Sequence, residues 1–367
     1  MMNKRPKDNH KKIVVALSGG VDSAVAAALL KKQGYEVIGA YFVFTKQTWK
    51  LSFQVKKIAN KLGIPLKIID ARKEFKKRVI DYFLNAYKKG QTPNPCVVCN
   101  KEMKFCLLFD LMKKEKADYA ATGHYAKISG RILAGESKSG LCLSASKPPK
   151  FFKAGLFEAE DKTKDQSYFL YKLAQKDLSK IIFPLGGYKK SEVKKMAKEM
   201  KLPVATNESQ DICFMPDNDA MKYFSKNIES ETGNIIDEAG KVLGRHRGLP
   251  IFTIGQRKGI EIGGTGPYWV IGKNIRKNEL IVTNDSKKLH KEKFWVSKVN
   301  WTNEKKKSPF RADVQIRYHS TRISAKIIPG KSGRLLVETK RPFRAVTAGQ
   351  SAVFYKNGEV LGGGTII

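Results

Sequence analysis

Five apolar residues, Ile13 to Leu17, lead directly into the hexapeptide Ser-Gly-Gly-Val-Asp-Ser at residues 18–23. The apolar run predicts a buried strand, and the hexapeptide predicts a turn that opens into a helix over residues 22–32. The two glycines let the backbone approach an anion closely, while the serine hydroxyls and the free N–H groups of the helix supply donors. The stretch therefore predicts a phosphate-binding loop. It is not a Walker loop, because the Gly-x4-Gly-Lys spacing is absent.

Strand-like and helix-like segments alternate through the first half of the chain. Strands are expected at residues 36–44, 65–69 and 118–121, and helices at residues 53–61, 74–88, 164–174 and 190–200. This alternation predicts an α/β fold, a doubly wound parallel sheet with helices on both faces and ligands at the carboxyl ends of its strands.

The pattern changes after about residue 216, where glycine-rich alternating segments replace the helices. The last stretch has short alternating runs separated by turns, which is typical of a small β-barrel. We expect three domains: residues 1–216, a small central domain over residues 217–290, and a C-terminal β-barrel over residues 291–367.

The chain is strongly basic, with 70 Lys and Arg against 34 Asp and Glu and a formal net charge of +36. Such a field concentrates polyanions, so nucleic acid is the expected partner. Residues 1–12 are basic but lack the apolar core of a signal peptide, and no apolar run approaches the length of a membrane span. We expect a cytoplasmic protein that does not engage a membrane.

Five cysteines in such a chain do not form a disulfide framework. Cys96 and Cys99 form a Cys-x-x-Cys pair and Cys213 stands far along the chain, whereas Cys106 and Cys142 lie among apolar residues and are expected in the core.

A nucleotide-activating enzyme can use two thiols for sulfur transfer. Once a carbonyl oxygen is adenylated, a persulfide can attack the carbon, and a second thiol can release the sulfur by closing a disulfide. Lysines near the thiols, such as Lys101 and Lys104, would raise the thiolate fraction.

The hexapeptide resembles the pyrophosphate loop (PP-loop) of the ATP pyrophosphatases, which implies that the parallel sheet is adenine nucleotide α-hydrolase-like. Nearly the whole chain resembles the tRNA-specific 2-thiouridylase family. The matching blocks, in the same order and at similar spacing, are residues 18–23, 92–105, 121–125, 164–170, 209–214, 253–264, 317–318, 349–353 and 361–364. The resemblance implies a tRNA-uridine 2-sulfurtransferase that uses ATP to convert the wobble uridine of lysine, glutamate and glutamine tRNAs to 2-thiouridine, releasing AMP and pyrophosphate.

The resemblance also implies roles for individual residues. Cys213 would carry the persulfide, and Cys99 would be the partner thiol that closes the disulfide. Asn94, Pro95 and Cys96 would face the target base. ATP would lie on Ala16, Leu17, Ser18, Gly19, Gly20, Val21, Asp22, Ser23, Phe42 and Gly123. The tRNA would contact His124, Lys164, Asp165, Gln166, Arg317, Tyr318 and Gln350.

The cofactors are expected to be ATP and Mg²⁺. Asp22 stands beside the phosphate loop, where a carboxylate can hold Mg²⁺ on the leaving pyrophosphate. Some family members have Asp where this chain has Cys96, and Cys96, Cys99 and Cys213 are alternatively ligands for an iron–sulfur cluster. The persulfide route is the favoured interpretation, because it needs no cofactor beyond ATP and Mg²⁺. A cysteine desulfurase or a sulfur-relay protein would supply the sulfur. Residues 45–53 lack the Lys-Asn-Trp-type stretch that often follows the second strand, which leaves the adenine contacts there open.

Two other functions are compatible with parts of the sequence. An amide-forming synthetase of the same ATP pyrophosphatase group would use the loop but has no need of the basic charge or the paired cysteines. A non-enzymatic RNA-binding protein would not need Asp22 or the three thiols. Among single residues, His124 is also compatible with a core or capping histidine, and Arg317 with an exposed barrel strand.

Overall fold

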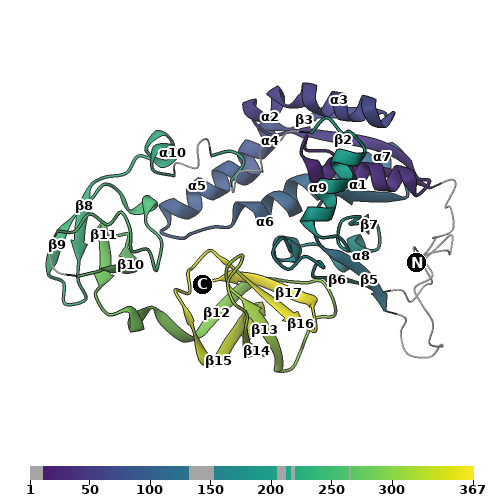
Figure 1. Cartoon of the computed structure of the whole chain (residues 1–367). Helices are drawn as coiled ribbons and strands as arrows, with labels where there is room; N and C mark the ends of the chain where they lie inside the picture. Colours follow the sequence, from purple (N-terminus) through teal and green to yellow (C-terminus); the bar gives the residue numbers. More distant parts are fainter. Residues whose placement is uncertain (1–10, 132–152, 205–211, 216–219, 264–265) are drawn as a thin grey trace.

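The computed structural model describes residues 11–131, 153–204, 212–215, 220–263 and 266–367. These residues form three sheets of five, four and eight strands (Figure 1). Cys142 and most of the expected N-terminal tail lie outside the described residues.

The first sheet is entirely parallel and has the order β3-β2-β1-β4-β7. Its strands are β1 (Lys12–Ala16), β2 (Glu36–Val43), β3 (Leu66–Asp70), β4 (Tyr119–Thr122) and β7 (Ile181–Ile182). Side chains of a strand alternate between the two faces of a sheet, and both faces of β1 are buried, which explains its continuous apolar run. The predicted doubly wound parallel sheet is confirmed.

Helices cover both faces of this sheet. Ile13 and Val15 pack with helices α1 (Val21–Lys32) and α3 (Ser52–Leu62), and α9 (Lys190–Glu199) packs on α1. Val14 points to the opposite face, into a cluster with α4 (Arg72–Phe75), α5 (Asp81–Lys88) and α7 (Cys106–Lys114). A π-helical segment (Lys76–Ile80) joins α4 to α5, another (Asn100–Phe105) joins α6 (Pro95–Cys99) to α7, and α2 (Lys46–Lys50) follows β2.

The helix expected over residues 164–174 is wrong. The chain there forms a 3₁₀ turn (Ser167–Leu170), followed by the short helix α8 (Gln175–Leu178). Asp165 competes with helix formation because its carboxylate accepts hydrogen bonds from the backbone N–H groups of Ala159 and Ser167, at 2.9 and 3.3 Å.

The central sheet has the order β10-β11-β8-β9 and a small core of its own, which includes Ile235, Val270 and Leu280. Its elements are α10 (Ala220–Asn227), β8 (Gly233–Ile236), β9 (Val242–His246), a 3₁₀ turn (Leu249–Ile251), β10 (Trp269–Asn274), β11 (Glu279–Thr283) and a second 3₁₀ turn (Ser286–Leu289).

The predicted C-terminal barrel is confirmed, because β12 pairs with both β15 and β17 and so closes a ring of six strands. The strands are β12 (His290–Trp301), β13 (Phe310–Gln315), β14 (Ile323–Pro329), β15 (Leu335–Arg344), β16 (Ser351–Lys356) and β17 (Glu359–Ile366), with a 3₁₀ turn (Lys331–Gly333) before β15. The sequence patterns gave no indication of the strands β5 (Lys127–Arg131) and β6 (Lys153–Phe157), which extend the barrel sheet through a pairing of β6 with β17.

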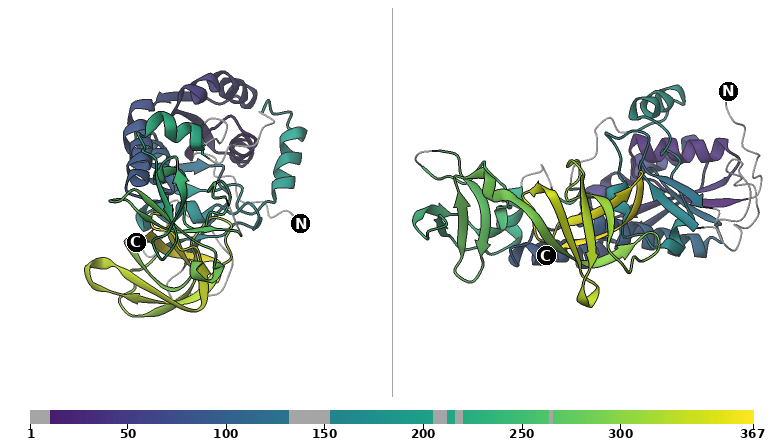
Figure 2. Two further views of the ribbon diagram at one scale, coloured as in Figure 1. Left: turned by 90° about the vertical axis from the view of Figure 1, so that its left-hand side faces the viewer. Right: turned by 90° about the horizontal axis from the view of Figure 1, so that it is seen from below.

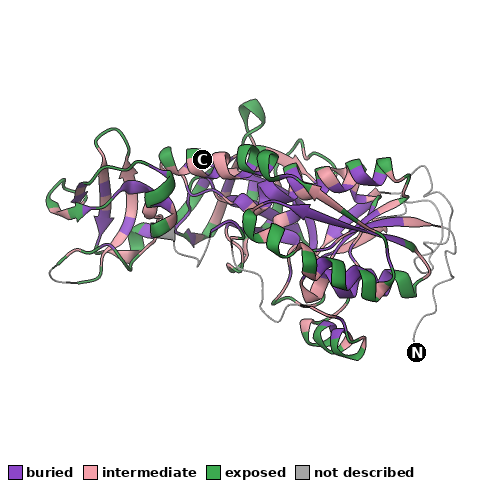
Figure 3. Ribbon diagram, turned by 90° about the horizontal axis from the view of Figure 1, so that it is seen from above, coloured by how far each residue is buried: buried purple, intermediate pink, exposed green. Residues whose placement is uncertain are grey.

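The molecule is elongated, with the central sheet at one end, the parallel sheet at the other and the barrel between them (Figure 2). Buried residues follow the strands, and exposed residues follow the outer faces of the helices (Figure 3). None of the helices in the described part of the chain is long and apolar enough to cross a membrane.

Candidate active site

The loop between β1 and α1 forms an anion cradle at the carboxyl edge of the parallel sheet. Gly19 has a φ of +86°, a left-handed conformation that favours glycine. The Ser23 hydroxyl accepts from the backbone N–H of Ser18 at 3.0 Å, donates to the carbonyl of Gly20 at 3.1 Å, and lies 3.1 Å from the Ser18 hydroxyl. No side chain caps α1 at Gly20, so the first N–H groups of this helix stay available to an anion.

The other residues expected around ATP lie in or next to this cradle, except Phe42, which lies on the neighbouring strand β2. A side-chain carbon at Gly123 would come within 2.8 Å of the backbone nitrogen of Ser23, so the end of β4 touches α1 only because this residue is glycine. Ala16 ends β1, Leu17 is buried and Val21 begins α1. Phe42 is 6% exposed with its ring in the core, but its backbone extends past Ala40, the last residue of β2 that pairs with β1.

Asp22, in the first turn of α1, is held by two side chains from distant parts of the chain. The Lys190 ammonium lies 2.6 Å from both of its carboxylate oxygens, and the Tyr125 hydroxyl donates to one of them at 2.8 Å. A single carboxylate suits a magnesium ion that arrives with ATP, because Mg²⁺ keeps most of its ligands as water and phosphate oxygens. The geometry therefore fits a nucleotide-borne metal and not a resident one.

The structure brings Cys96, Cys99 and Cys213 into one neighbourhood with Lys104. Burial raises the pKa of Cys99 to about 12, the charge of Lys104 opposes this, and nearby Cys213 and Cys96 add to it. Cys213 is an exposed residue, yet protein surrounds its thiol closely enough for burial to raise its pKa, again against Lys104. One lysine thus favours the thiolate form of both sulfurs.

The described cysteines are all free thiols. Within the described ranges, no three side chains of His, Cys, Asp or Glu converge in a way that would hold a metal ion. The expectation that Cys106 lies in the core is wrong: it is exposed, and its sulfur lies 3.9 Å from an Asp110 carboxylate oxygen.

The segment expected to face the target base begins α6. Asn94 caps this helix by accepting from the backbone N–H of Val97 at 3.3 Å, and Pro95 occupies its first turn, where a missing N–H costs nothing. The two cysteines of the Cys-x-x-Cys pair lie on the same short helix, with Cys96 partly exposed and Cys99 buried. Asn94 and Pro95 therefore fix the start of the helix that carries the two thiols.

His124 comes after β4 and lies between two aromatic rings. The centroid of its imidazole is 6.0 Å from that of the Phe105 ring and 6.1 Å from that of the Phe183 ring. Its Nδ1 is 2.7 Å from the Thr122 hydroxyl. Burial, and to a smaller extent the charge of Lys104, lowers the pKa of His124 to about 3, so the imidazole is neutral at physiological pH.

The three residues expected to contact tRNA at positions 164–166 differ in their surroundings. Lys164 and Gln166 are partly exposed, and Gln166 is fixed to Tyr125 by two hydrogen bonds, of 2.8 and 3.0 Å. Asp165 is 8% exposed, and burial raises its pKa. Its carboxylate therefore bonds to groups inside the protein.

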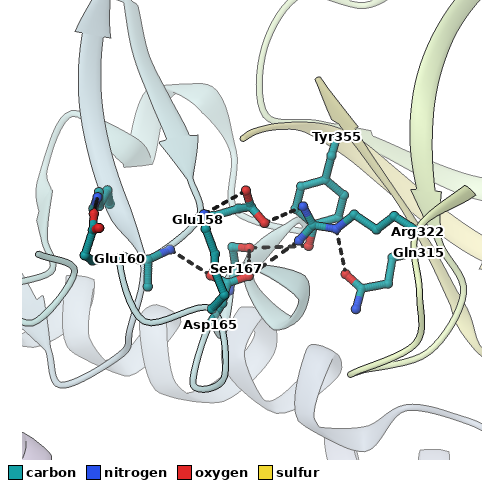
Figure 4. Close-up of polar contacts among 10 residues, drawn as sticks. Glu158, Glu160, Asp165, Ser167, Gln315, Arg322 and Tyr355 are labelled. Atoms are coloured by element: carbon teal, nitrogen blue, oxygen red, sulfur yellow. Dashed lines mark hydrogen bonds and ion pairs between the residues drawn. The ribbon is translucent and has the colours of Figure 1, made fainter. Parts of the chain in front are cut away.

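Asp165 belongs to a polar cluster that joins this segment to the barrel (Figure 4). Arg322, directly before β14 of the barrel, forms ion pairs with Glu158 and, at 3.7 Å, with Asp165. Its guanidinium stacks on the Tyr355 ring at 3.5 Å, and the Tyr355 hydroxyl lies 3.3 Å from Ser167. The cluster attaches residues 158–167, which include Lys164, to the barrel.

Arg317, Tyr318 and Gln350 lie where the three sheets meet. Arg317 donates to the backbone carbonyls of Ile254 and Ala345, each at 3.0 Å, and so bridges the central sheet and the barrel. Tyr318 packs on Phe169 with ring centroids 4.4 Å apart. The Gln350 amide donates to the carbonyl of Thr92 at 2.9 Å, just before α6.

Lys190, Tyr125 and Arg322 complete these arrangements, and the sequence patterns assign none of them a role at the site. Lys104 is predicted from the sequence only as a neighbour of the thiols. Lys190 and Arg322 are 168 and 157 residues from their carboxylate partners Asp22 and Asp165, and no local pattern relates them. The absence of a lysine from the phosphate loop is the one signal that a cation must come from elsewhere.

The fold and the cradle define a nucleotide-binding α/β protein of the PP-loop type, joined to a barrel. Three family models match the chain: "tRNA methyl transferase HUP domain" over residues 11–217, "tRNA methyl transferase PRC-barrel domain" over residues 221–284, and "Aminomethyltransferase beta-barrel domain" over residues 291–366. Relatives match over nearly the full length of both chains. The chain belongs to the tRNA-specific 2-thiouridylase family, as the sequence motifs predicted.

Three relatives illustrate the match. The tRNA-specific 2-thiouridylase MnmA 2 of Clostridium tetani is 39% identical, over 97% of this chain and 98% of its own. The MnmA proteins of Geobacillus thermodenitrificans and Chloroflexus aurantiacus are 39% and 40% identical, over 100% and 96% of this chain and 96% and 98% of their own. A solved structure, the U34-tRNA thiolase NcsA of Methanococcus maripaludis with its [4Fe-4S] cluster, is 20% identical with a TM-score of 0.37 over 56% of this chain and 63% of its own. That likeness is too low to bear on a cluster here.

Proposed function

We propose that this protein is a tRNA-uridine 2-sulfurtransferase that adenylates the C2 carbonyl oxygen of the wobble uridine with ATP and replaces that oxygen with persulfide sulfur. Family membership supports thiolation of a tRNA uridine as the reaction. The observation that carries the mechanism is the meeting of Cys99 and Cys213 beside Lys104, on the same α/β unit as the phosphate cradle.

In the first step, the cradle formed by residues 16–23 holds the phosphates of ATP through backbone N–H groups and the Ser18 and Ser23 hydroxyls. Gly123 borders the same space, Phe42 would meet the nucleotide from the end of β2, and Asp22 is the carboxylate that would hold Mg²⁺, which would neutralise charge on the leaving pyrophosphate. The uridine C2 oxygen attacks the α-phosphorus, pyrophosphate leaves, and the oxygen becomes part of an AMP leaving group.

The second step transfers sulfur. The terminal sulfur of a Cys213 persulfide loses its proton and attacks C2; the C2–O bond breaks and AMP departs, leaving the tRNA joined to Cys213 through a sulfur–sulfur bond. The Cys99 thiolate then attacks the Cys213 sulfur, and the electron pair of the broken bond leaves with the 2-thiouridine. A Cys99–Cys213 disulfide remains, and a thiol reductant resets it.

The remaining predicted residues belong to tRNA recognition. Asn94, Pro95 and Cys96 would face the target base, and Lys164, Gln166, His124, Arg317, Tyr318 and Gln350 would contact the tRNA, with Asp165 holding its neighbours in place from the interior. We propose that the chain works as three domains, divided near residues 216 and 290, in which the barrel grips the tRNA of lysine, glutamate and glutamine acceptors. The β5–β6 hairpin, although inside the first domain, belongs to the barrel sheet.

The sulfur source is a persulfide donor such as a cysteine desulfurase or a sulfur-relay protein, which must reach the exposed residue Cys213. Methyl transfer, the activity in two of the family-model descriptions, gives no role to the paired thiols. The same thiols separate this proposal from an amide-forming synthetase.

The test is reconstitution. Purified protein is incubated with ATP, Mg²⁺, a persulfide donor and unmodified tRNA, and the wobble nucleoside is analysed by mass spectrometry. We expect 2-thiouridine and stoichiometric AMP. AMP without a thiolated base would contradict the sulfur-transfer step, and a methylated base would contradict the proposal as a whole.

A further inference from the structure

A row of apolar side chains crosses the outer face of the barrel. The strand register aligns Ile328 of β14 with Leu336 of β15 and Leu336 with Trp295 of β12. The backbone N–H of Ile367 donates to the Trp295 carbonyl at 3.0 Å and continues the row past the end of β17. The residues next to this apolar strip along each strand belong to the barrel core; they are Ile327, Leu335, Val337, Val296 and Ile366. Because side chains alternate along a strand, the apolar strip itself faces outward.

The exposed end of the apolar strip has the character of a binding surface. Trp295 and Ile367 are 42% and 48% exposed, and a contiguous exposed apolar patch commonly marks a site of interaction. The indole of Trp295 borders an open hollow of about 340 Å³, which is within the range of small-ligand sites. A side-chain carbon at Gly330 would come within 2.9 Å of the indole, so glycine keeps this approach to the ring open.

The charged side chains of the hollow are both cations. Lys331 and Arg334 line it together with Ser332 and Trp295. Both cations are exposed, and neither has a carboxylate partner within the part of the chain that the structure describes. A second copy of this chain, which also carries a net charge of +36, would be repelled from such a surface. An aromatic face beside two cations suits a nucleotide, whose base stacks on the ring and whose phosphates meet the cations.

The apolar strip leads to residues that already belong to the expected tRNA surface. Only β17 separates Trp295 from Gln350, because the backbone of Ile366 bonds to Gly349 and Gln350, each at 2.9 Å. A side-chain carbon at Gly349 would come within 3.0 Å of the Thr92 carbonyl oxygen, so the strip ends against the segment that precedes α6. An RNA that reaches Gln350 therefore passes next to the hollow.

We propose that the hollow beside Trp295 binds one unpaired nucleotide of the tRNA, with its base stacked on the indole and its phosphates on Lys331 and Arg334. This rests on the proposed function, since it adds a binding site for the same RNA. A base inside a duplex is already stacked between its neighbours and does not reach the indole. The site therefore selects an unpaired base, and it tolerates any base because each has a face that stacks.

The experiment compares a tRNA with an RNA that has no unpaired bases. Affinities of Trp295→Ala and Trp295→Phe for an unmodified lysine tRNA transcript and for a fully base-paired RNA duplex of similar length are measured by filter binding. We expect Trp295→Ala to bind the tRNA about 5- to 100-fold more weakly and the duplex as the wild type does. Trp295→Phe should recover most of the loss, because a phenyl ring also stacks on a base.

The dependence on salt separates the stacking group from the cations. Trp295→Ala should keep the wild-type slope of log affinity for tRNA against log salt, because the indole meets no phosphate. Arg334→Met should reduce the magnitude of that slope by about 1. A wild-type slope in Arg334→Met would overturn the assignment of the phosphates.

The matched control is Trp49→Ala, which removes an indole of similar exposure, 50%, from α2. It should leave both affinities unchanged. Wild-type tRNA affinity in Trp295→Ala, or an equal loss for tRNA and duplex, would overturn the proposal. So would slower sulfur uptake from a persulfide donor at wild-type tRNA affinity, which would assign the apolar strip to a protein partner, or a wild-type dimer that Trp295→Ala dissociates. Failure of the proposed function is separate: the wild-type protein would then bind tRNA without thiolating it.

Discussion

Lys104 is the residue on which the reactivity of the two thiols depends most directly. Its charge lowers the pKa of both Cys99 and Cys213, against burial that raises them. Lys104→Met should therefore raise both pKa values, decrease the thiolate fraction at neutral pH and slow alkylation by iodoacetamide several-fold. Alkylation of each cysteine is measured by peptide mass spectrometry between pH 7 and pH 10, where the rates should rise with pH.

Cys106 is the internal control for that measurement. It is an exposed thiol whose pKa is raised first by burial and then by the charge of Asp110, with further effects of Arg78, Glu102 and Lys101. Its alkylation rate should stay the same in the variant. Unchanged rates at Cys99 and Cys213 would show that Lys104 does not activate them.

His124 makes a pH-dependent contribution to stability whose sign is set by its lowered pKa of about 3. The unfolded chain binds a proton near pH 6.5 and the folded chain does not, so this contribution is fully present above pH 6.5 and is lost as the pH falls toward 3. At pH 5 the loss amounts to about 2 kcal/mol, since one pKa unit is about 1.4 kcal/mol. His124→Asn should lose less stability than the wild type between pH 7 and pH 5 in urea unfolding. Parallel losses in the two proteins would contradict a buried neutral imidazole.

At the scale of elements, the sequence predicted those parts whose signal is local. The strand, glycine turn and helix of residues 13–32 and the α/β alternation depend on neighbours a few residues apart, and the structure has them. The segment at residues 164–174 was misassigned because its apolar residues face tertiary partners. Tyr168 and Tyr171, for example, reach Ser351 of the barrel through their hydroxyls. Such burial imitates a helical period without requiring a helix.

The site was likewise predictable only where its signal lies in residues close together in the sequence. The cradle, the thiols and the expected tRNA contacts could be named from motifs, but the cations that pair with the carboxylates could not. Lys190 meets Asp22, and Arg322 meets Glu158 and Asp165, only after the sheets have assembled. The pairing of β6 with β17 was invisible for the same reason, since the two strands are about 200 residues apart.

The cluster around Arg322 should determine how firmly residues 158–170 are held. Removing one partner of a buried ion pair costs about 3–5 kcal/mol, and the 26% exposure of Arg322 reduces this to about 2–3 kcal/mol. Arg322→Met should lower stability by that amount in denaturant unfolding and increase hydrogen exchange in residues 158–170. Arg311→Met, at an exposed barrel position, is the control. Exchange that stays slow in residues 158–170 of Arg322→Met would show that the cluster is dispensable.

At the scale of the whole molecule, the three sheets converge on the segment that leads into α6. The Thr92 hydroxyl lies 3.4 Å from that of Thr253 in the central unit, and the backbone of Thr92 bonds to Ala348 and Gln350 of the barrel. A tRNA held by the barrel would therefore act on the residues that precede Cys96 and Cys99. This junction joins the barrel and the central unit to the segment that leads into the helix of the two thiols.

The charge of +36 predicts how tRNA binding depends on salt. Each phosphate contact releases counterions, so a plot of log affinity against log salt should be steep, with a slope of roughly −4 to −8 for a protein that contacts RNA with lysines and arginines from all three units. Lys164→Gln should reduce the magnitude of that slope by about 1 if Lys164 meets a phosphate. Lys305→Gln, in the exposed lysine run before β13, removes the same charge elsewhere and should leave the slope unchanged. A flat plot for the wild-type protein would mean that tRNA is held by neutral contacts, and equal slopes for Lys164→Gln and the wild type would remove Lys164 from the tRNA surface.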